Sequence, residues 1–241
     1  MCNWVLKNNK ENPFKLFLYL KLTYPSGKIT LNSSEIDVAA LTIGCTSRTV
    51  KNNLNKIIDF GWIYYDDEFK FYRLVSLDVI RSDYNWDLRR AYTFTFKDLR
   101  HIKATLGAVL YTQLYKTYCK RFLKKRKSNV LKSESANKPF TFSCDVKKYA
   151  EVSVLSIKEF YGINISKASL LKQEAFKYGL IEVKKQYMKL KREQVYATKK
   201  SLKYREQSQN IIFKDGSYHL QLIDKIYSNL YFKRRKNLET L

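Results

Sequence analysis

The 241-residue sequence predicts a mainly α fold with small β-hairpins (α+β), in which one structural unit occurs twice in tandem. Three observations predict it. Apolar residues recur at helical spacing, and short alternating segments beside turn residues indicate hairpins. Gly44 and Gly61 are 17 residues apart, as are Gly162 and Gly179, and each second glycine follows an aromatic residue and precedes an apolar pair. Repetition of this kind within one chain is stronger evidence than a single motif.

The composition indicates a folded and strongly basic protein. Apolar residues make up 45% of the chain, including 14 Phe and 19 Tyr, which is enough for a substantial core. The net charge is +24, from 46 Lys and Arg against 22 Asp and Glu. Residues 1–100 hold 15 basic and 11 acidic residues, whereas residues 101–241 hold 31 and 11. Because such an excess costs self-repulsion, we expect a polyanionic partner, nucleic acid in preference to a membrane.

The residue types argue against a metal site, a membrane span and an enzyme. The four cysteines form no CxxC pair and only His101 and His219 could join them, so we expect no metal and no other cofactor. No secretory signal or long charge-free apolar run occurs, so we expect a cytoplasmic protein without a membrane partner. There is no GxxxxGK[ST] loop, and we expect no catalytic residue and no small-molecule ligand.

The first unit is predicted as helix, strand, helix, turn, helix and hairpin. Its first helix begins at Pro13, a residue suited to the first helical position, and "KITL" alternates as a short strand. Ser33 or Ser34 is expected to cap the second helix, and Thr46 or Ser47 the third. "WIYY", the acidic turn "DDE" and "FKFYRLV" predict the hairpin.

The second unit repeats this order. "VLYTQLYKTYCKRFL" predicts its first helix, and Pro139 with "FTFS" stands where Pro25 and "ITLNS" stand in the first unit. "SIKEFYGINISKASLLKQEAFKYGLIEVKKQY" then repeats the two helices and the hairpin. Between these parts, "RKSNVLKSESANK" is predicted to be a polar, mobile loop.

These patterns divide the chain into four parts. Residues 1–78 form the first unit, 79–104 a connecting segment with an extra strand in "RAYTFTF", 105–192 the second unit and 193–241 a basic C-terminal extension. In the extension, "NIIFKDGSYHLQLI" predicts a hairpin that turns at Asp215-Gly216. Packing on the second unit, pairing with another chain and phosphate binding remain alternatives for this extension.

The stretch "AALTIGCTSRTVKNNLNKIIDFGWI" resembles the helix-turn-helix of winged-helix DNA-binding proteins. The resemblance rests on the small Ala, the turn Gly, "SRTV", the spaced aliphatic residues and the closing "GWI", and it covers Pro13 to Leu77. It identifies a fold superfamily, not a single family. It implies two tandem winged-helix domains with double-stranded DNA as the partner.

On the third helix, Val50, Leu54 and Ile57 point to one side and are predicted to face the core. The opposite side carries residue types that suit a major groove, where Arg can bind guanine and Asn adenine through paired hydrogen bonds. The predicted DNA-binding residues of this helix are Arg48, Thr49, Lys51, Asn52, Asn55 and Lys56. An ordinary solvated helix face is the alternative interpretation.

In the second unit, the corresponding helix is predicted to bury Ala168, Leu171 and Ala175. Its predicted DNA-binding residues are Ser166, Lys167, Ser169, Lys172, Gln173 and Lys177. The predicted phosphate-binding wing "EVKKQYMKLKRE" carries Lys184, Lys185, Lys189, Lys191 and Arg192. The first wing instead turns on Asp66, Asp67 and Glu68, which phosphates would repel.

The sequence therefore predicts a double-stranded DNA-binding protein, a sequence-specific transcription regulator of a phage or mobile element. It would be nucleoid-associated or an intracellular phage protein. A plasmid or phage replication initiator is one alternative, because such initiators can be built from two winged helices. A second is an interaction protein whose first domain forms a homodimer. A third is binding of RNA or single strands through the basic, aromatic-rich second half.

Overall fold

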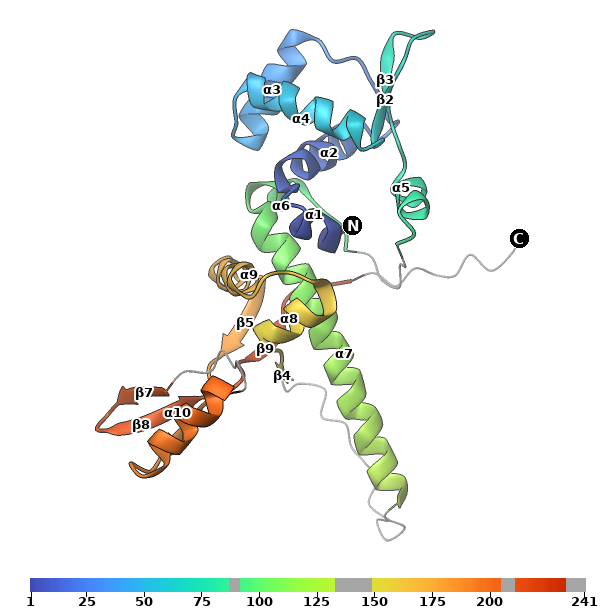
Figure 1. Cartoon of the computed structure of the whole chain (residues 1–241). Coiled ribbons are helices and arrows are strands. Elements are labelled where there is room, and N and C mark those ends of the chain that lie inside the picture. Colours follow the sequence, from blue (N-terminus) through green and yellow to red (C-terminus); the bar gives the residue numbers. More distant parts are fainter. Residues whose placement is uncertain (87–91, 133–148, 205–210, 233–241) are drawn as a thin grey trace. The chain divides into compact units, whose positions relative to one another are not determined.

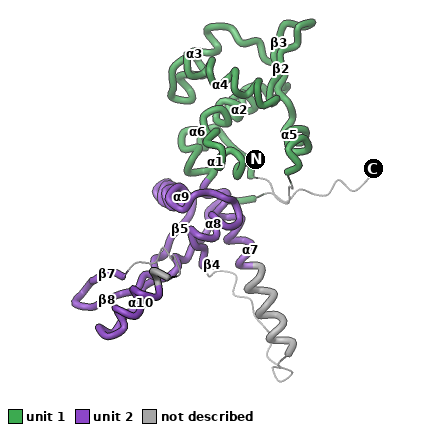
Figure 2. The backbone as a smooth tube through the Cα atoms, viewed as in Figure 1, with its two compact units in different colours: residues 1–106, 231–241 green, residues 107–230 purple. Residues whose placement is uncertain are grey.

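The computed structural model describes residues 1–86, 92–132, 149–204 and 211–232 (Figure 1). The chain is α+β, with 54% of residues in helices and 17% in strands, so the predicted predominance of helix is confirmed. It divides into two compact units (Figure 2). Unit 1 comprises residues 1–106 and 231–241, and unit 2 comprises residues 107–230. Tyr231 and Phe232 therefore group with unit 1, which the predicted domain boundaries did not anticipate.

The elements of unit 1 follow the predicted order, with further helices on either side. They are α1 (Cys2–Lys7), α2 (Glu11–Thr23), β1 (Lys28–Ile29), α3 (Ser33–Ile43), α4 (Ser47–Asp59), β2 (Ile63–Asp66), β3 (Phe71–Leu74), α5 (Leu77–Asp83) and α6 (Phe96–Arg100).

Local side-chain chemistry sets the limits of α3 and α4. Asn32, not the expected serines, caps α3, because its side chain accepts a hydrogen bond from the Glu35 amide while the Glu35 carboxylate accepts one from Asn32. Gly44 ends α3 with φ +70°, a left-handed conformation that a residue with a Cβ rarely adopts. Thr46 caps α4 by accepting a hydrogen bond from the Thr49 amide, as predicted.

The first sheet has the order β1-β3-β2, with both pairs antiparallel. The predicted hairpin is confirmed, since Ile63 pairs with Leu74 and Asp66 with Phe71. The adjacent core is aromatic. Trp62 is fully buried, and its ring centroid lies 5.3 Å from that of Phe17 and 5.2 Å from that of Phe60. This packing anchors the start of the sheet against α2 and the end of α4.

The elements of unit 2 begin with a long helix whose first turn belongs to unit 1. They are α7 (Ile102–Lys132), β4 (Ala150–Glu151), α8 (Val154–Tyr161), α9 (Ile165–Lys177), β5 (Ile181–Lys184), β6 (Tyr187–Leu190), α10 (Gln194–Tyr204), β7 (Ile211–Lys214), β8 (Ser217–Gln221) and β9 (Lys225–Ser228).

The two units share one strand topology. The sheet β4-β9-β5 corresponds to β1-β3-β2, and in each the third strand in the chain lies between the other two. The register matches as well: Ile181 pairs with Ser228, as Ile63 pairs with Leu74. The amide of Leu180 donates to the Ala175 carbonyl at 2.9 Å, and its counterpart Trp62 donates to Ile57 at 2.9 Å. The predicted repeat therefore extends to individual backbone hydrogen bonds.

The predicted second wing is wrong. A hairpin over residues 182–193 would require β5 to pair with β6, but β5 pairs with β9 and β6 pairs with β8. Residues 185–224, here called the insertion, separate β5 from β9 and form α10 with a second sheet of order β6-β8-β7. The region 193–241 is accordingly no separate extension, because β9 completes the central sheet of unit 2.

Other predictions have mixed outcomes. The turn at Asp215-Gly216 is confirmed, with φ values of +51° and +69° that suit a two-residue hairpin loop. In "RAYTFTF", residues 92–95 form no strand, α6 begins at Phe96, and the remaining residues lie outside the described part. The first residues of "RKSNVLKSESANK" continue α7 to Lys132, so the predicted loop is wrong there. "FTFS" lies outside the described residues.

Close packing of α7 on α9 generates the first testable prediction. A Cβ on Gly107 would lie 2.8 Å from the Leu171 Cβ and 3.1 Å from the Leu171 carbonyl oxygen. Gly107→Ala should therefore lower the free energy of unfolding of unit 2 by about 1–3 kcal/mol, because overpacking forces the helices apart. Denaturant unfolding of the full chain measures this. Thr117→Ala, an exposed change in α7, is the control, and equal effects of the two variants would contradict the packing argument.

Candidate nucleic-acid interface

Burial of one side of α4 determines which side chains face solvent. Val50, Leu54 and Ile57 are 2%, 7% and 0% exposed, as predicted. Asn53 is buried as well, at 6%, which periodicity did not indicate because the residue is polar. These side chains pack α4 against α2 and α3, the two helices with which it makes its main contacts.

The N-terminus of α4 is held by polar contacts to α3 and to the preceding turn. The Ser47 hydroxyl donates to an Asp37 carboxylate oxygen on α3. The hydroxyls of Thr46 and Thr49 lie 2.9 Å apart, in hydrogen-bonding contact. Thr49 is therefore only half-exposed and already engaged in the cap, unlike the other residues predicted to bind DNA from this helix.

The exposed side of α4 presents a row of cations and amides. Its exposed members are Arg48, Lys51, Asn52, Asn55 and Lys56. Within the part of the chain that the structure describes, no hydrogen bond or ion pair holds these side chains. They can therefore bind an external partner without breaking an internal contact.

The corresponding helix α9 is less uniform. Ala168, Leu171 and Ala175 are buried, as predicted. The Tyr111 hydroxyl donates a hydrogen bond to the Ala168 carbonyl at 3.0 Å. The pKa of Tyr111 is raised above its ordinary value, first by burial and second by the negative charge of the nearby Asp224 carboxylate. On the other side, the exposed residues predicted to bind DNA are Ser166, Gln173 and Lys177, whereas Lys167 and Ser169 are half-buried. The large apolar residue Leu170 lies among them, 59% exposed.

Lys172 does not belong to that exposed side. Its ammonium pairs with the carboxylate of Asp224, and the two side chains are only 14% and 6% exposed. Gln221 Nε2 also donates to the same carboxylate, at 3.5 Å. Lys172 therefore stabilises unit 2 and is unavailable to a phosphate. Sequence reasoning missed this because Asp224 is 52 residues away along the chain.

The negative charge of the β2–β3 hairpin is partly neutralised by an ion pair within the hairpin. The Arg73 Nε donates to Asp66 at 2.7 Å, and the Phe69 amide donates to the same carboxylate at 3.2 Å. Although desolvation acts in the opposite direction, these contacts hold the pKa of Asp66 below its ordinary value. The Arg73 guanidinium also lies 5.0 Å from the centre of the Phe71 ring. The hairpin thus combines one neutralised carboxylate with exposed aromatic rings.

The basic residues of the predicted second wing are exposed, and all of them except Lys184 lie within the insertion. Lys184 ends β5, with its ammonium 4.2 Å from the centre of the Tyr149 ring. Lys189 lies on β6, Lys185 precedes that strand, and Lys191 with Arg192 follows it. A further basic segment that could contact phosphate, "KRFLKKRK" at residues 120–127, has side chains that lie outside the described residues.

Two further site classes find no support in the described residues. No group of three or more His, Cys, Asp and Glu side chains there could hold a metal ion. In the same residues, no helix combines the length and apolarity that a membrane crossing requires.

Comparison with protein-family models, with curated proteins and with solved structures finds no match to this chain. The geometry of the units and their charge must therefore carry any functional proposal.

The Lys172–Asp224 pair provides the second prediction. Lys172→Met should lower the free energy of unfolding by about 3 kcal/mol, because it leaves a buried carboxylate without its cation. Urea unfolding of the full chain measures the loss. Adding Asp224→Leu to Lys172→Met should restore most of it, since the unpaired charge is then gone. Lys177→Met, an exposed change on the same helix, is the control. If Lys172→Met were as harmless as Lys177→Met, the buried pair would have no structural role.

Proposed function

We propose that this protein binds double-stranded DNA with sequence preference, through two tandem winged-helix domains, and that it catalyses no reaction. The observation that carries the proposal is the exposed side of α4, where Arg48, Asn52 and Asn55 have no internal partner in the described residues. Arg and Asn are the side chains that read guanine and adenine in the major groove. The N-terminal part of such a helix usually faces the bases, which favours Arg48 and Asn52.

The shared topology of the two units supports this proposal. Each has a helix, a short strand, two helices joined at a left-handed glycine, and a sheet in which the third strand is central. That order is the one expected of a winged helix. The net charge of +24 adds a long-range attraction to phosphate, which supplies affinity without sequence information.

Regulation of transcription, in a phage or mobile element, is the biological role that we propose for such binding. A replication initiator would need the same duplex recognition, and it is the alternative role. The two roles differ in the step after binding, since only an initiator starts DNA synthesis at its site. An origin-dependent replication assay therefore separates them.

Replacement of Arg48 tests the proposal directly. The probe is a duplex recovered from a random pool by selection on the wild-type protein at near-physiological salt. Arg48→Ala should weaken binding to this duplex about 10-fold, because a paired Arg–guanine contact is worth roughly 1–3 kcal/mol. Fluorescence anisotropy measures the affinity.

Arg100→Ala is the matched control, because Arg100 is also exposed in unit 1 but lies on α6. It removes the same charge and should change affinity much less. Equal losses in the two variants would show that α4 contributes only nonspecific attraction.

An exposed apolar pair on α3 favours a second use of unit 1, as a dimer surface. Leu41 is 83% exposed and Val38 is 55% exposed. The double variant Arg48→Glu/Lys51→Glu distinguishes the two uses. It should abolish site-specific binding if α4 reads bases, and leave binding intact if unit 1 serves only to dimerise. Sedimentation of Leu41→Ser against wild type then tests the dimer itself.

A further inference from the structure

The insertion is the part of unit 2 that has no counterpart in unit 1. Four residues, 67–70, join β2 to β3, whereas 40 residues, 185–224, separate the corresponding strands β5 and β9. The insertion contains nine Lys and Arg residues against four Asp and Glu, a net charge of +5. An enlarged connection with this charge suits a polyanionic ligand.

One face of the insertion's sheet is basic. Lys189 on β6 pairs with His219 on β8, and His219 pairs with Ile212 on β7. Because side chains alternate along a strand, the residues two positions away lie on the same face. This basic face consists of Tyr187, Lys189, Ile212, Lys214, Ser217, His219 and Gln221. The opposite face carries the two buried side chains of the sheet, Leu190 and Leu220, together with the exposed Met188 and Phe213.

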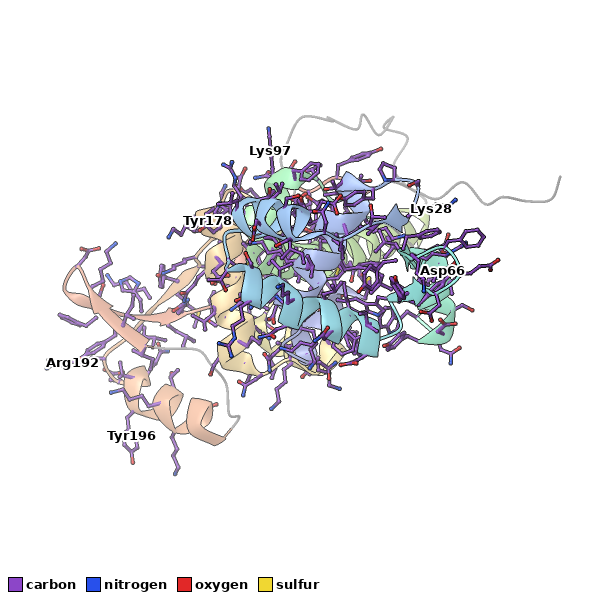
Figure 3. All side chains as sticks on the ribbon, turned by 90° about the horizontal axis from the view of Figure 1, so that it is seen from above. Lys28, Asp66, Lys97, Tyr178, Arg192 and Tyr196 are labelled. Atoms are coloured by element: carbon purple, nitrogen blue, oxygen red, sulfur yellow. The ribbon has the colours of Figure 1, made fainter. Side chains whose placement is uncertain are left out.

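Aromatic rings are exposed beside these cations. Tyr187 is 43% exposed, two residues from Lys189. Tyr196 on α10 is 78% exposed, and Lys200 follows it one helical turn later, also exposed. Figure 3 shows Tyr196 and Arg192 together at the outer edge of the insertion.

The combination of rings and lysines discriminates between two forms of DNA. A duplex presents phosphates, which lysine binds, but its bases are stacked inside and offer no free faces. A single strand presents phosphates and unstacked bases, and bases stack on exposed aromatic side chains with little regard to sequence. Exposed rings would gain little from a duplex backbone.

We propose that the insertion binds single-stranded DNA, with Tyr187 and Tyr196 stacking on bases while Lys189 and Lys200 contact phosphates. This goes beyond the duplex binding proposed above and relies on different residues. The protein would then hold a duplex through α4 and a separated strand through the insertion.

The test uses the full chain and a fluorescein-labelled (dT)20 oligonucleotide, with anisotropy measured at near-physiological salt. Tyr187→Ala should weaken oligonucleotide binding about 5-fold or more, which is the scale of one lost base–aromatic stack. Tyr187→Phe keeps the ring and should bind within about twofold of wild type. Tyr64→Ala is the matched control, because Tyr64 is 50% exposed on β2 of unit 1.

Two further measurements separate the possible outcomes. Lys189→Ala should reduce the slope of log affinity against log salt by about 0.7, the value for one single-strand phosphate contact. Affinity for the selected duplex should be unchanged in Tyr187→Ala. Unchanged oligonucleotide binding in Tyr187→Ala and Lys189→Ala would overturn the proposal, as would equal losses on oligonucleotide and duplex. A wild-type protein that bound the oligonucleotide but no duplex would refute only the duplex function.

Discussion

Packing of the apolar side of α4 against α2 and α3 is the constraint on which the candidate interface depends. Val50, Leu54 and Ile57 can be buried together only in one rotation of the helix about its axis. That rotation leaves Arg48 and Asn52 in solvent, where nothing in the described structure holds them. The hydrophobic effect therefore determines which polar side chains of α4 face solvent and can contact a partner. The Thr46 cap determines where α4, and with it this exposed row of side chains, begins.

The two units show how one topology can carry different surfaces. Both close the third helix with a left-handed glycine, Gly61 or Gly179, and both place the last strand centrally in the sheet. On α4 the exposed row is cationic and amide-rich, whereas α9 exposes Leu170 and directs Lys172 inward to Asp224. Their hairpin regions differ more, since a four-residue turn in unit 1 corresponds to the 40-residue insertion in unit 2. Under the two proposals above, unit 1 would contact duplex DNA alone, whereas unit 2 would also contact single-stranded DNA through the insertion.

Local patterns predicted the features that depend on nearby residues. The α4 stripe, the β2–β3 hairpin and the Asp215-Gly216 turn arise from interactions within a few residues, so periodicity and turn chemistry indicated them. The errors came from long-range pairing. "EVKKQYMKLKRE" alternates like a hairpin, yet its strands find partners in β8 and β9, and no local signal reports which distant strand will pair. The inward direction of Lys172 was hidden for the same reason.

Whether α4 touches the bases of duplex DNA can be measured directly by crosslinking. Asn52 is replaced by the photoreactive residue p-benzoylphenylalanine, Arg100 is replaced likewise in a second protein, and each is irradiated with the selected duplex. If α4 reads the bases, position 52 should crosslink to bases inside the selected site, and position 100 should give few crosslinks or none. Retained binding without crosslinks from position 52, or equal crosslinking from both positions, would contradict the claim that α4 reads the DNA.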